Sequence, residues 1–183
     1  MSHRARNPLR VIESRRMTLV AASPELLAAD LDGAAALAAA LGAEVPENWP
    51  PELFGNQVMH LLGDQLRDPA ESGWSLWYLL SRKHSVPRLM GVCQFKGRPD
   101  SGGSVELAYS VLQQYRIQGY ATEAVARLVT WAFGHQYVTE VTAETLPYLK
   151  QSIRVMEKNG FQFEGPGSEQ GVVRYALKKL SGR

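Results

Sequence analysis

The chain has little of several features that identify protein classes. Its 183 residues contain one cysteine, Cys93, which excludes an internal disulfide and a cysteine-based metal cluster. The net charge of +2 is smaller than a nucleic-acid-binding protein usually shows, so nucleic acid is not an expected partner. No apolar run is long enough to span a bilayer, and no apolar segment follows the basic start as in a secretory signal. No membrane partner is therefore expected, and the predicted location is cytoplasmic.

Motifs for several kinds of site are also missing. The four histidines are scattered, no ligand spacing suggests zinc, and no metal is expected. Neither G-x-G-x-x-G nor G-x-x-x-x-G-K-[ST] occurs, so dinucleotide-binding and P-loop hypotheses have no motif to support them. Nothing matches the G-x-S-x-G turn that carries the serine of α/β-hydrolases. Function has to be sought in other patterns.

The composition is that of a soluble globular protein, with 45% hydrophobic and 21% charged residues. The length suits one full domain and is short for two. We expect a domain over residues 16–183, preceded by a flexible basic tail over residues 1–15. The alternative for this start is a basic arm that binds ribosome or nucleic acid through Arg4, Arg6, Arg10, Arg15 and Arg16.

The order of predicted elements indicates an α+β fold. Antiparallel strands come first and a strand–helix–strand–helix succession follows, which gives a mixed, mostly antiparallel sheet of about seven strands flanked by helices. A helix over residues 26–41 should break near Gly33, and further helices are expected at 56–67, 121–133 and 149–158. The predicted strands are 17–21, 74–81, 88–96, 105–112, 137–145, 161–164 and 172–178.

Residues 107–133 are the most informative stretch, because they open as a strand and continue as an amphipathic helix. The apolar helix positions recur every three or four residues and share one face: Ala121, Ala124, Val125, Leu128, Val129, Ala132 and Phe133. Gly119 stands where this helix begins, and the first N–H groups of a helix are unpaired and favour negative charge. The stretch therefore predicts a phosphate-binding loop made by the backbone amides of residues 118–122.

Two motifs carry a resemblance to a known family. Arg116-x-x-Gly119-x-Ala121 matches the Gln/Arg-x-x-Gly-x-Gly/Ala signature of GNAT superfamily acetyltransferases, at the expected place after a strand. Downstream, residues 143–147 and 152–161 resemble the segment in which those enzymes place a helix that ends in a Gly-Phe pair. The overall pattern is most similar to the branch of ribosomal-protein N-terminal acetyltransferases.

The resemblance implies a GNAT-like fold and an N-acetyltransferase that uses acetyl-CoA as cosubstrate. The acceptor would be a primary amine, either a protein N-terminus or a small molecule, which attacks the thioester directly. A backbone N–H near Val111 would stabilise the charge that develops on the thioester carbonyl. The implied cosubstrate contacts are Val111, Leu112, Arg116, Ile117, Gln118, Gly119, Tyr120, Ala121, Thr122 and Ser152.

Glu106 is the first candidate for the base that takes the acceptor's proton. On an alternating strand it shares a face with Ala108 and Ser110, whose small side chains leave room for a substrate beside the carboxylate. A solvated strand glutamate is the other interpretation of the residue itself. The resemblance favours the catalytic role, exerted through a water molecule. Glu144, at the end of the next strand, is the second candidate.

The group that protonates the leaving thiolate is harder to assign. Many family members have a tyrosine at the position of Met156, and the related branch commonly has an asparagine at the position of Leu149. Ser152 is the remaining candidate, with Tyr148 as a weaker one, although a serine there also suits a helix-start hydroxyl that bonds the backbone. These departures sustain an alternative hypothesis of a non-catalytic CoA-binding or ligand-sensing module.

The segment before the second predicted helix is stiffened by Pro46, Pro50 and Pro51 around Trp49. In GNAT enzymes this region usually determines acceptor specificity, so Trp49 is predicted to bind substrate. The alternative is that Trp49 only fills the edge of the core. The sequence leaves the acceptor's identity and the oligomeric state open, with a homodimer among the options.

Overall fold

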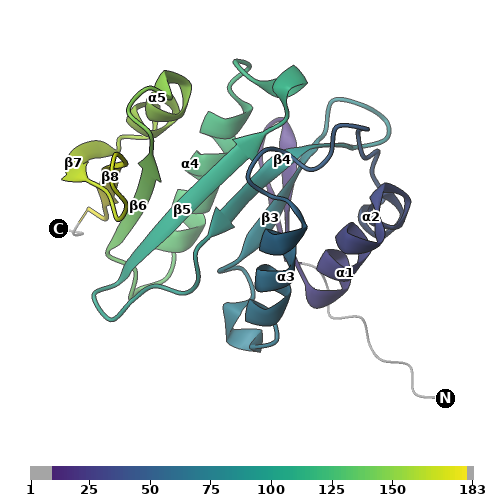
Figure 1. Cartoon of the computed structure of the whole chain (residues 1–183), viewed down its shortest axis with the longest axis horizontal. Helices are drawn as coiled ribbons and strands as arrows, with labels where there is room; N and C mark the ends of the chain where they lie inside the picture. Colours follow the sequence, from purple (N-terminus) through teal and green to yellow (C-terminus); the bar gives the residue numbers. More distant parts are fainter. Residues whose placement is uncertain (1–9, 181–183) are drawn as a thin grey trace.

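A computed structural model describes residues 10–180 of the chain (Figure 1). The strands are β1 Val11–Glu13, β2 Met17–Ala21, β3 Leu76–Ser81, β4 Arg88–Phe95, β5 Ser104–Val111, β6 Glu140–Thr145, β7 Gln162–Pro166 and β8 Val173–Lys178. The helices are α1 Pro24–Asp32, α2 Ala34–Leu41, α3 Asn56–Gln65, α4 Tyr120–Phe133 and α5 Lys150–Lys158, with short 3-10 turns η1 Pro69–Glu71 and η2 Gln113–Tyr115.

The strands form one eight-stranded sheet in the order β1-β2-β3-β4-β5-β6-β8-β7. Every neighbouring pair is antiparallel except β5 with β6, which is parallel. This confirms the predicted α+β fold with a mixed, mostly antiparallel sheet. Within residues 10–180, no helix combines the length and the apolar character needed to cross a membrane.

Helices cover both faces of the sheet, with α1, α2 and α3 in front and α4 behind it in Figure 1. Strand side chains alternate between the two faces, and this produces two hydrophobic cores. One core contains Leu19 and Leu79 with Val125 of α4, and the other contains Val20 and Tyr78 with residues of α1 and α3. The predicted apolar face of α4 lies in the first core.

Local signals set the ends of the first helices. The hydroxyl of Ser23 accepts a hydrogen bond from the N–H of Leu26 at 3.2 Å, and Pro24 is the first helical residue. Gly33, with φ of 115°, separates α1 from α2, which confirms the predicted break. Gly42 ends α2 in the left-handed conformation.

The eighth strand, β1, was missed by the sequence analysis. It has three residues, pairs antiparallel with β2, and shows only partial burial, so it carries no alternating apolar pattern. Residues 11–13 were expected in the tail and instead form the edge of the sheet. Residues 1–9 of the expected tail, with Arg4 and Arg6, lie outside the described residues.

The sheet divides between β5 and β6. These strands pair only from Ser104 opposite Glu140 to Glu106 opposite Thr142. Beyond that rung β5 continues to Val111 and remains paired with β4, while β6 continues to Thr145 and remains paired with β8. The two strands therefore diverge towards their carboxyl ends and leave an opening in the sheet, as Figure 1 shows.

Candidate active site

The opening exposes an edge of β5 whose backbone groups have no strand opposite. The N–H of Lys96 donates to the carbonyl of Glu106 at 3.0 Å, and the N–H of Leu112 donates to the carbonyl of Met90 at 2.9 Å. The backbone groups of Glu106 and Leu112 therefore point towards β4. Because backbone groups alternate along a strand, those of Tyr109 and Val111 point into the opening. The Val111 carbonyl indeed accepts from Nε of Arg116 at 2.9 Å, on that side. The predicted oxyanion donor, Val111 N–H, thus faces the opening.

The loop between η2 and α4 lies at the end of this edge. Gly119, the N-cap of α4, has φ of 81°. Ile117 has φ of 58°, which is rare for a β-branched residue and costs ~1–3 kcal/mol. Within the part of the chain that the structure describes, no hydrogen bond uses the N–H groups of residues 117–122. A run of unpaired amides at a helix N-terminus suits an anionic phosphate.

Ser152 reaches the opening from α5. The hydroxyl of Tyr109 donates to the Ser152 carbonyl at 2.8 Å and lies 3.2 Å from Ser152 Oγ, so β5 and α5 are joined across the gap. Burial raises the pKa of Tyr109 to about 12. The phenol therefore keeps its proton at neutral pH and is a second proton-bearing group beside Ser152, which the sequence analysis missed. Met156 is buried in the core, and Tyr148 is exposed.

Glu106 occupies the last paired rung, where the opening begins. Its side chain is 22% exposed and forms an ion pair with Lys96. Ala108 and Ser110 follow on the same face of β5 and are only partly buried, so space remains beside the strand. The structure thus places this candidate base at the inner end of the opening.

Glu144 lies on the same face of the sheet as Glu106, because Glu106 pairs with Thr142, but its oxygens are engaged. The Ser168 hydroxyl donates to Oε2 at 2.6 Å, and the Ser168 N–H lies 3.0 Å from both carboxylate oxygens. Burial alone would raise the pKa of Glu144, but these hydrogen bonds and the charges of Lys96 and Arg174 hold it below its ordinary value. Only 6% of the Glu144 side chain is exposed, and its hydrogen bonds to Ser168 stabilise the β7–β8 turn. The geometry favours Glu106 as the base.

The Trp49 loop lies beside the predicted phosphate-binding loop. The side-chain amides of Asn48 and Gln114 form two reciprocal hydrogen bonds of 2.9 and 3.1 Å, and Nη2 of Arg116 lies 3.4 Å from Oε2 of Glu52. These contacts join two segments that lie far apart in the sequence. The predicted acceptor wall and cosubstrate loop are therefore neighbours.

Trp49 packs as the core-filling alternative expects, and it also lines a cavity, so its predicted contact with substrate stays a prediction. It packs against the core under α1 and α3, and it lines a cavity of about 270 Å³ together with Asp30, Phe54 and Met59. Its indole N–H donates to Oδ1 of Asp30 at 2.9 Å, and the Tyr78 hydroxyl donates to Oδ2 at 2.9 Å. Burial raises the pKa of Asp30, although both hydrogen bonds oppose the rise.

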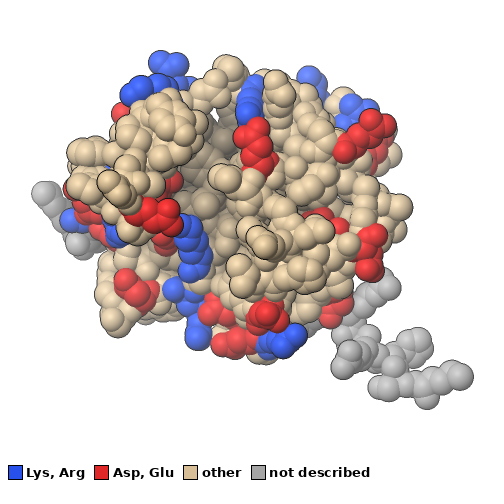
Figure 2. Space-filling model, in the orientation of Figure 1, with Lys and Arg blue, Asp and Glu red and all other residues tan. Residues whose placement is uncertain are grey.

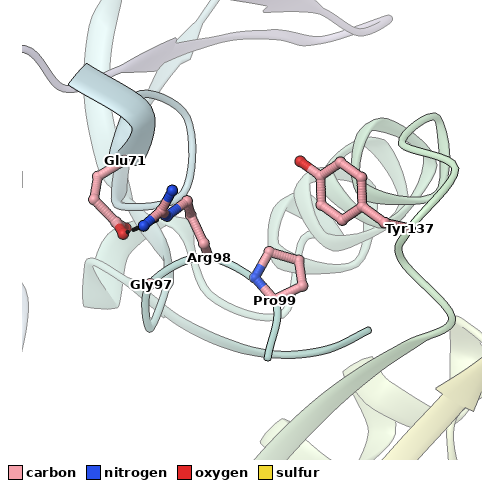
Figure 3. A pocket seen from close by; sticks show the side chains of 5 residues that line it. All are labelled: Glu71, Gly97, Arg98, Pro99 and Tyr137. Carbon is pink, nitrogen blue, oxygen red and sulfur yellow. Dashed lines mark hydrogen bonds and ion pairs between the residues drawn. The ribbon is translucent and has the colours of Figure 1, made fainter. Parts of the chain in front are cut away.

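A cavity of about 530 Å³ lies elsewhere, at the amino ends of β5 and β6 (Figure 3). It is lined by Glu71, Gly97, Arg98, Pro99 and Tyr137, and Nε of Arg98 is bound to Glu71 at 3.0 Å. The opening, in contrast, lies at the carboxyl ends of these strands. Figure 2 shows the molecule hollowed between α5 and the middle of the sheet, with acidic and basic side chains at the rim. Among residues 10–180, no group of His, Cys, Asp and Glu side chains could hold a metal ion.

Comparison with known proteins agrees with this geometry. The family model of the acetyltransferase (GNAT) domain matches residues 25–162. The uncharacterized N-acetyltransferase YjdG of Bacillus subtilis (strain 168) is 25% identical over 138 residues, which are 75% of this chain and 81% of the relative.

Two solved structures show the same fold. RimL, a ribosomal L7/L12 alpha-N-protein acetyltransferase in complex with coenzyme A, has a TM-score of 0.65 and 18% identity, over 92% of this chain and 98% of that one. A chimera of the spermidine N-acetyltransferase SpeG from Vibrio cholerae and hSSAT has a TM-score of 0.60 and 15% identity, over 88% and 95%.

The divided sheet and the amide-lined loop are those of an acyltransferase that uses CoA thioesters, and the chain belongs to the GNAT family. It is an acetyl-CoA-dependent N-acetyltransferase. The family assignment thus favours the enzyme over the non-catalytic module that Met156 and Leu149 had kept open.

Proposed function

We propose that this enzyme transfers acetyl from acetyl-CoA to a primary amine in the opening between β5 and β6. The observation that carries the proposal is the continuity of that opening with the loop of unpaired amides at residues 117–122. These amides fit the diphosphate of the cosubstrate, and the exposed edge of β5 leads from them towards Glu106. Acetyl-CoA supplies the acetyl group as a thioester.

Each residue has a defined task in direct transfer. Glu106, through a water molecule, accepts a proton as the amine nitrogen bonds the carbonyl carbon. The Val111 N–H donates a hydrogen bond to the carbonyl oxygen, where negative charge develops. When the carbon–sulfur bond breaks, the hydroxyl pair of Tyr109 and Ser152 provides a proton for the leaving thiolate. From the sequence, Ser152 was the first candidate for this acid and Tyr148 a weaker one.

The electrostatics on the acceptor side support an amine. Glu106 lies at the inner end of the opening, in an ion pair with Lys96, and Asp30 lines the cavity to which Trp49 contributes. Both carboxylates lie on the proposed acceptor side, and a carboxylate favours a group that is cationic in water. The two enzymes of similar fold are named as acetyltransferases of a protein α-amine and of spermidine. We propose a protein N-terminus or a small-molecule amine for this one.

A panel experiment tests this function. Release of free thiol from acetyl-CoA is followed with polyamines, monoamines, amino-acid amides and short peptides with free N-termini. Each peptide is matched by the same peptide with a blocked N-terminus. Thiol release with one class of free amine, and none with the blocked partner, is the expected result. Release that is independent of any amine would contradict direct transfer.

A further inference from the structure

Glu123 places a negative charge beside the proposed diphosphate site. It belongs to the first turn of α4, directly after residues 117–122 whose amides are unpaired. A carboxylate in a first turn stabilises a helix by itself. Here the same helix end has to receive an anionic diphosphate, so an uncompensated Glu123 would repel the ligand that the loop fits.

Arg16, at the end of the β1–β2 turn, compensates this charge. Its Nε lies 2.6 Å from Oε2 of Glu123, and its backbone N–H donates to Oε1 at 2.9 Å. The Ser14 hydroxyl donates to Oε1 at 2.7 Å, so the turn surrounds the carboxylate. Burial tends to raise the pKa of Glu123, but the bonds from Arg16 and Ser14 outweigh it and hold the pKa below its ordinary value.

The same guanidinium reaches the phosphate-binding loop. Nη1 of Arg16 donates to the carbonyl of Gln118 at 2.8 Å, and its Cζ lies 4.5 Å from the centre of the Tyr120 ring. Nη2 lies 3.2 Å from the position that a Cβ on Gly119 would take. One side chain therefore binds Glu123, orients Gln118 and brings positive charge next to the N-cap of α4.

We propose that Arg16 is a residue of the cosubstrate's diphosphate site. It neutralises Glu123 and holds the Gln118 carbonyl away from the anion, and in this way it couples the β1–β2 turn to acetyl-CoA binding. This rests on the proposed function, because it takes the loop to be the diphosphate site. The sequence had suggested a role for Arg16 only in the alternative of a basic arm that binds ribosome or nucleic acid. A purely structural ion pair is the alternative.

Coenzyme A binding by calorimetry separates these roles in four proteins: wild type, Arg16→Gln, Glu123→Gln and the double variant. Arg16→Gln should weaken binding about 10- to 100-fold, the range for losing a hydrogen bond to a charged group. Glu123→Gln should bind as tightly as wild type or more tightly. The double variant should recover most of the affinity, because the repelling carboxylate is gone. Added salt should lower the affinity of the wild type more steeply than that of Arg16→Gln, because salt also screens the repulsion between Glu123 and the ligand in the variant.

Arg82→Gln is the matched control, because Nη1 of Arg82 also holds the β1–β2 turn, through Glu13 at 3.2 Å and the Ser14 carbonyl at 3.2 Å. It should leave coenzyme A affinity unchanged. If Arg16→Gln does not fold, Arg16→Lys replaces it and should lose affinity to a smaller degree.

Equal affinity of folded Arg16→Gln and wild type overturns the inference. A double variant as weak as Arg16→Gln overturns the charge-compensation argument. A wild type that does not bind coenzyme A contradicts the proposed function instead.

Discussion

Replacing Glu106 by glutamine tests the assignment of the base. The substitution keeps the size of the side chain and removes its charge, which leaves Lys96 without its partner. Since 50% of the Lys96 side chain and 22% of the Glu106 side chain are exposed, water screens this pair, and its loss should cost ~0–1 kcal/mol. For a chain of this size that corresponds to a fall in Tm of about 4 °C or less.

The effect on the reaction should be far larger than the effect on stability. Removal of a general base typically lowers the rate ~10²–10⁴-fold. Coenzyme A affinity should hardly change, because the amides of residues 117–122 belong to a different segment. Raising the pH should partly rescue the variant, because a larger fraction of the amine then arrives deprotonated and needs no base.

The assay is kcat/KM against pH, with Glu140→Gln as the control. Glu140 lies on the same face of the sheet as Glu106, opposite Ser104. It accepts a hydrogen bond from the Ser104 hydroxyl at 3.1 Å, and 17% of its side chain is exposed. That variant should follow the wild-type profile. Equal profiles for Glu106→Gln and wild type would refute the reasoning, make Glu106 a structural residue of β5, and leave Glu144 as the next to test.

Three further substitutions examine other parts of the site. Gly119→Glu puts a side chain and a negative charge at the left-handed N-cap, so coenzyme A affinity measured by calorimetry should fall at least ~10-fold in a folded variant; unchanged affinity would place the diphosphate elsewhere. Trp49→Ala should raise the acceptor KM and leave coenzyme A affinity nearly intact; a large loss of thermal stability with unchanged KM would support the core-filling role. Tyr109→Phe should lower kcat without changing coenzyme A affinity. The raised pKa of Tyr109 contributes stability that is fully present below pH 10 and is lost as the pH rises to about 12. Between these pH values the free energy of unfolding should therefore fall less steeply with pH for the variant than for the wild type.

Local patterns were enough to predict much of the fold. The start, apolar face and end of α4 follow from its own residues, and Gly33 and Gly42 delimit α2 in the same way. The glycine-entered start of α4 could be predicted for this reason too, because a glycine before an amphipathic helix is a signal within a few residues, and phosphate binding there stays a prediction. The short strand β1 could not, since three partly exposed residues carry no period.

The arrangement of the site required the tertiary structure. Where β5 and β6 part depends on which rungs of two distant strands pair, and neither strand's sequence states it. The hydrogen bond from Tyr109 to Ser152 depends on how α5 packs against β5, and the hydrogen bonds that engage Glu144, the second candidate base, depend on where the β7–β8 turn lies. Arg16 and Glu123 are 107 residues apart.

The sequence by itself determined the kind of protein and the loop that suits the cosubstrate, because helix starts, turns and strand alternation arise from interactions between near neighbours. Only the tertiary structure decided which carboxylate lies where β5 and β6 part, which hydroxyls meet between β5 and α5, and which arginine pairs with Glu123 in the first turn of α4. Those properties depend on distance and burial, which are set by the packing of segments that are remote in the chain.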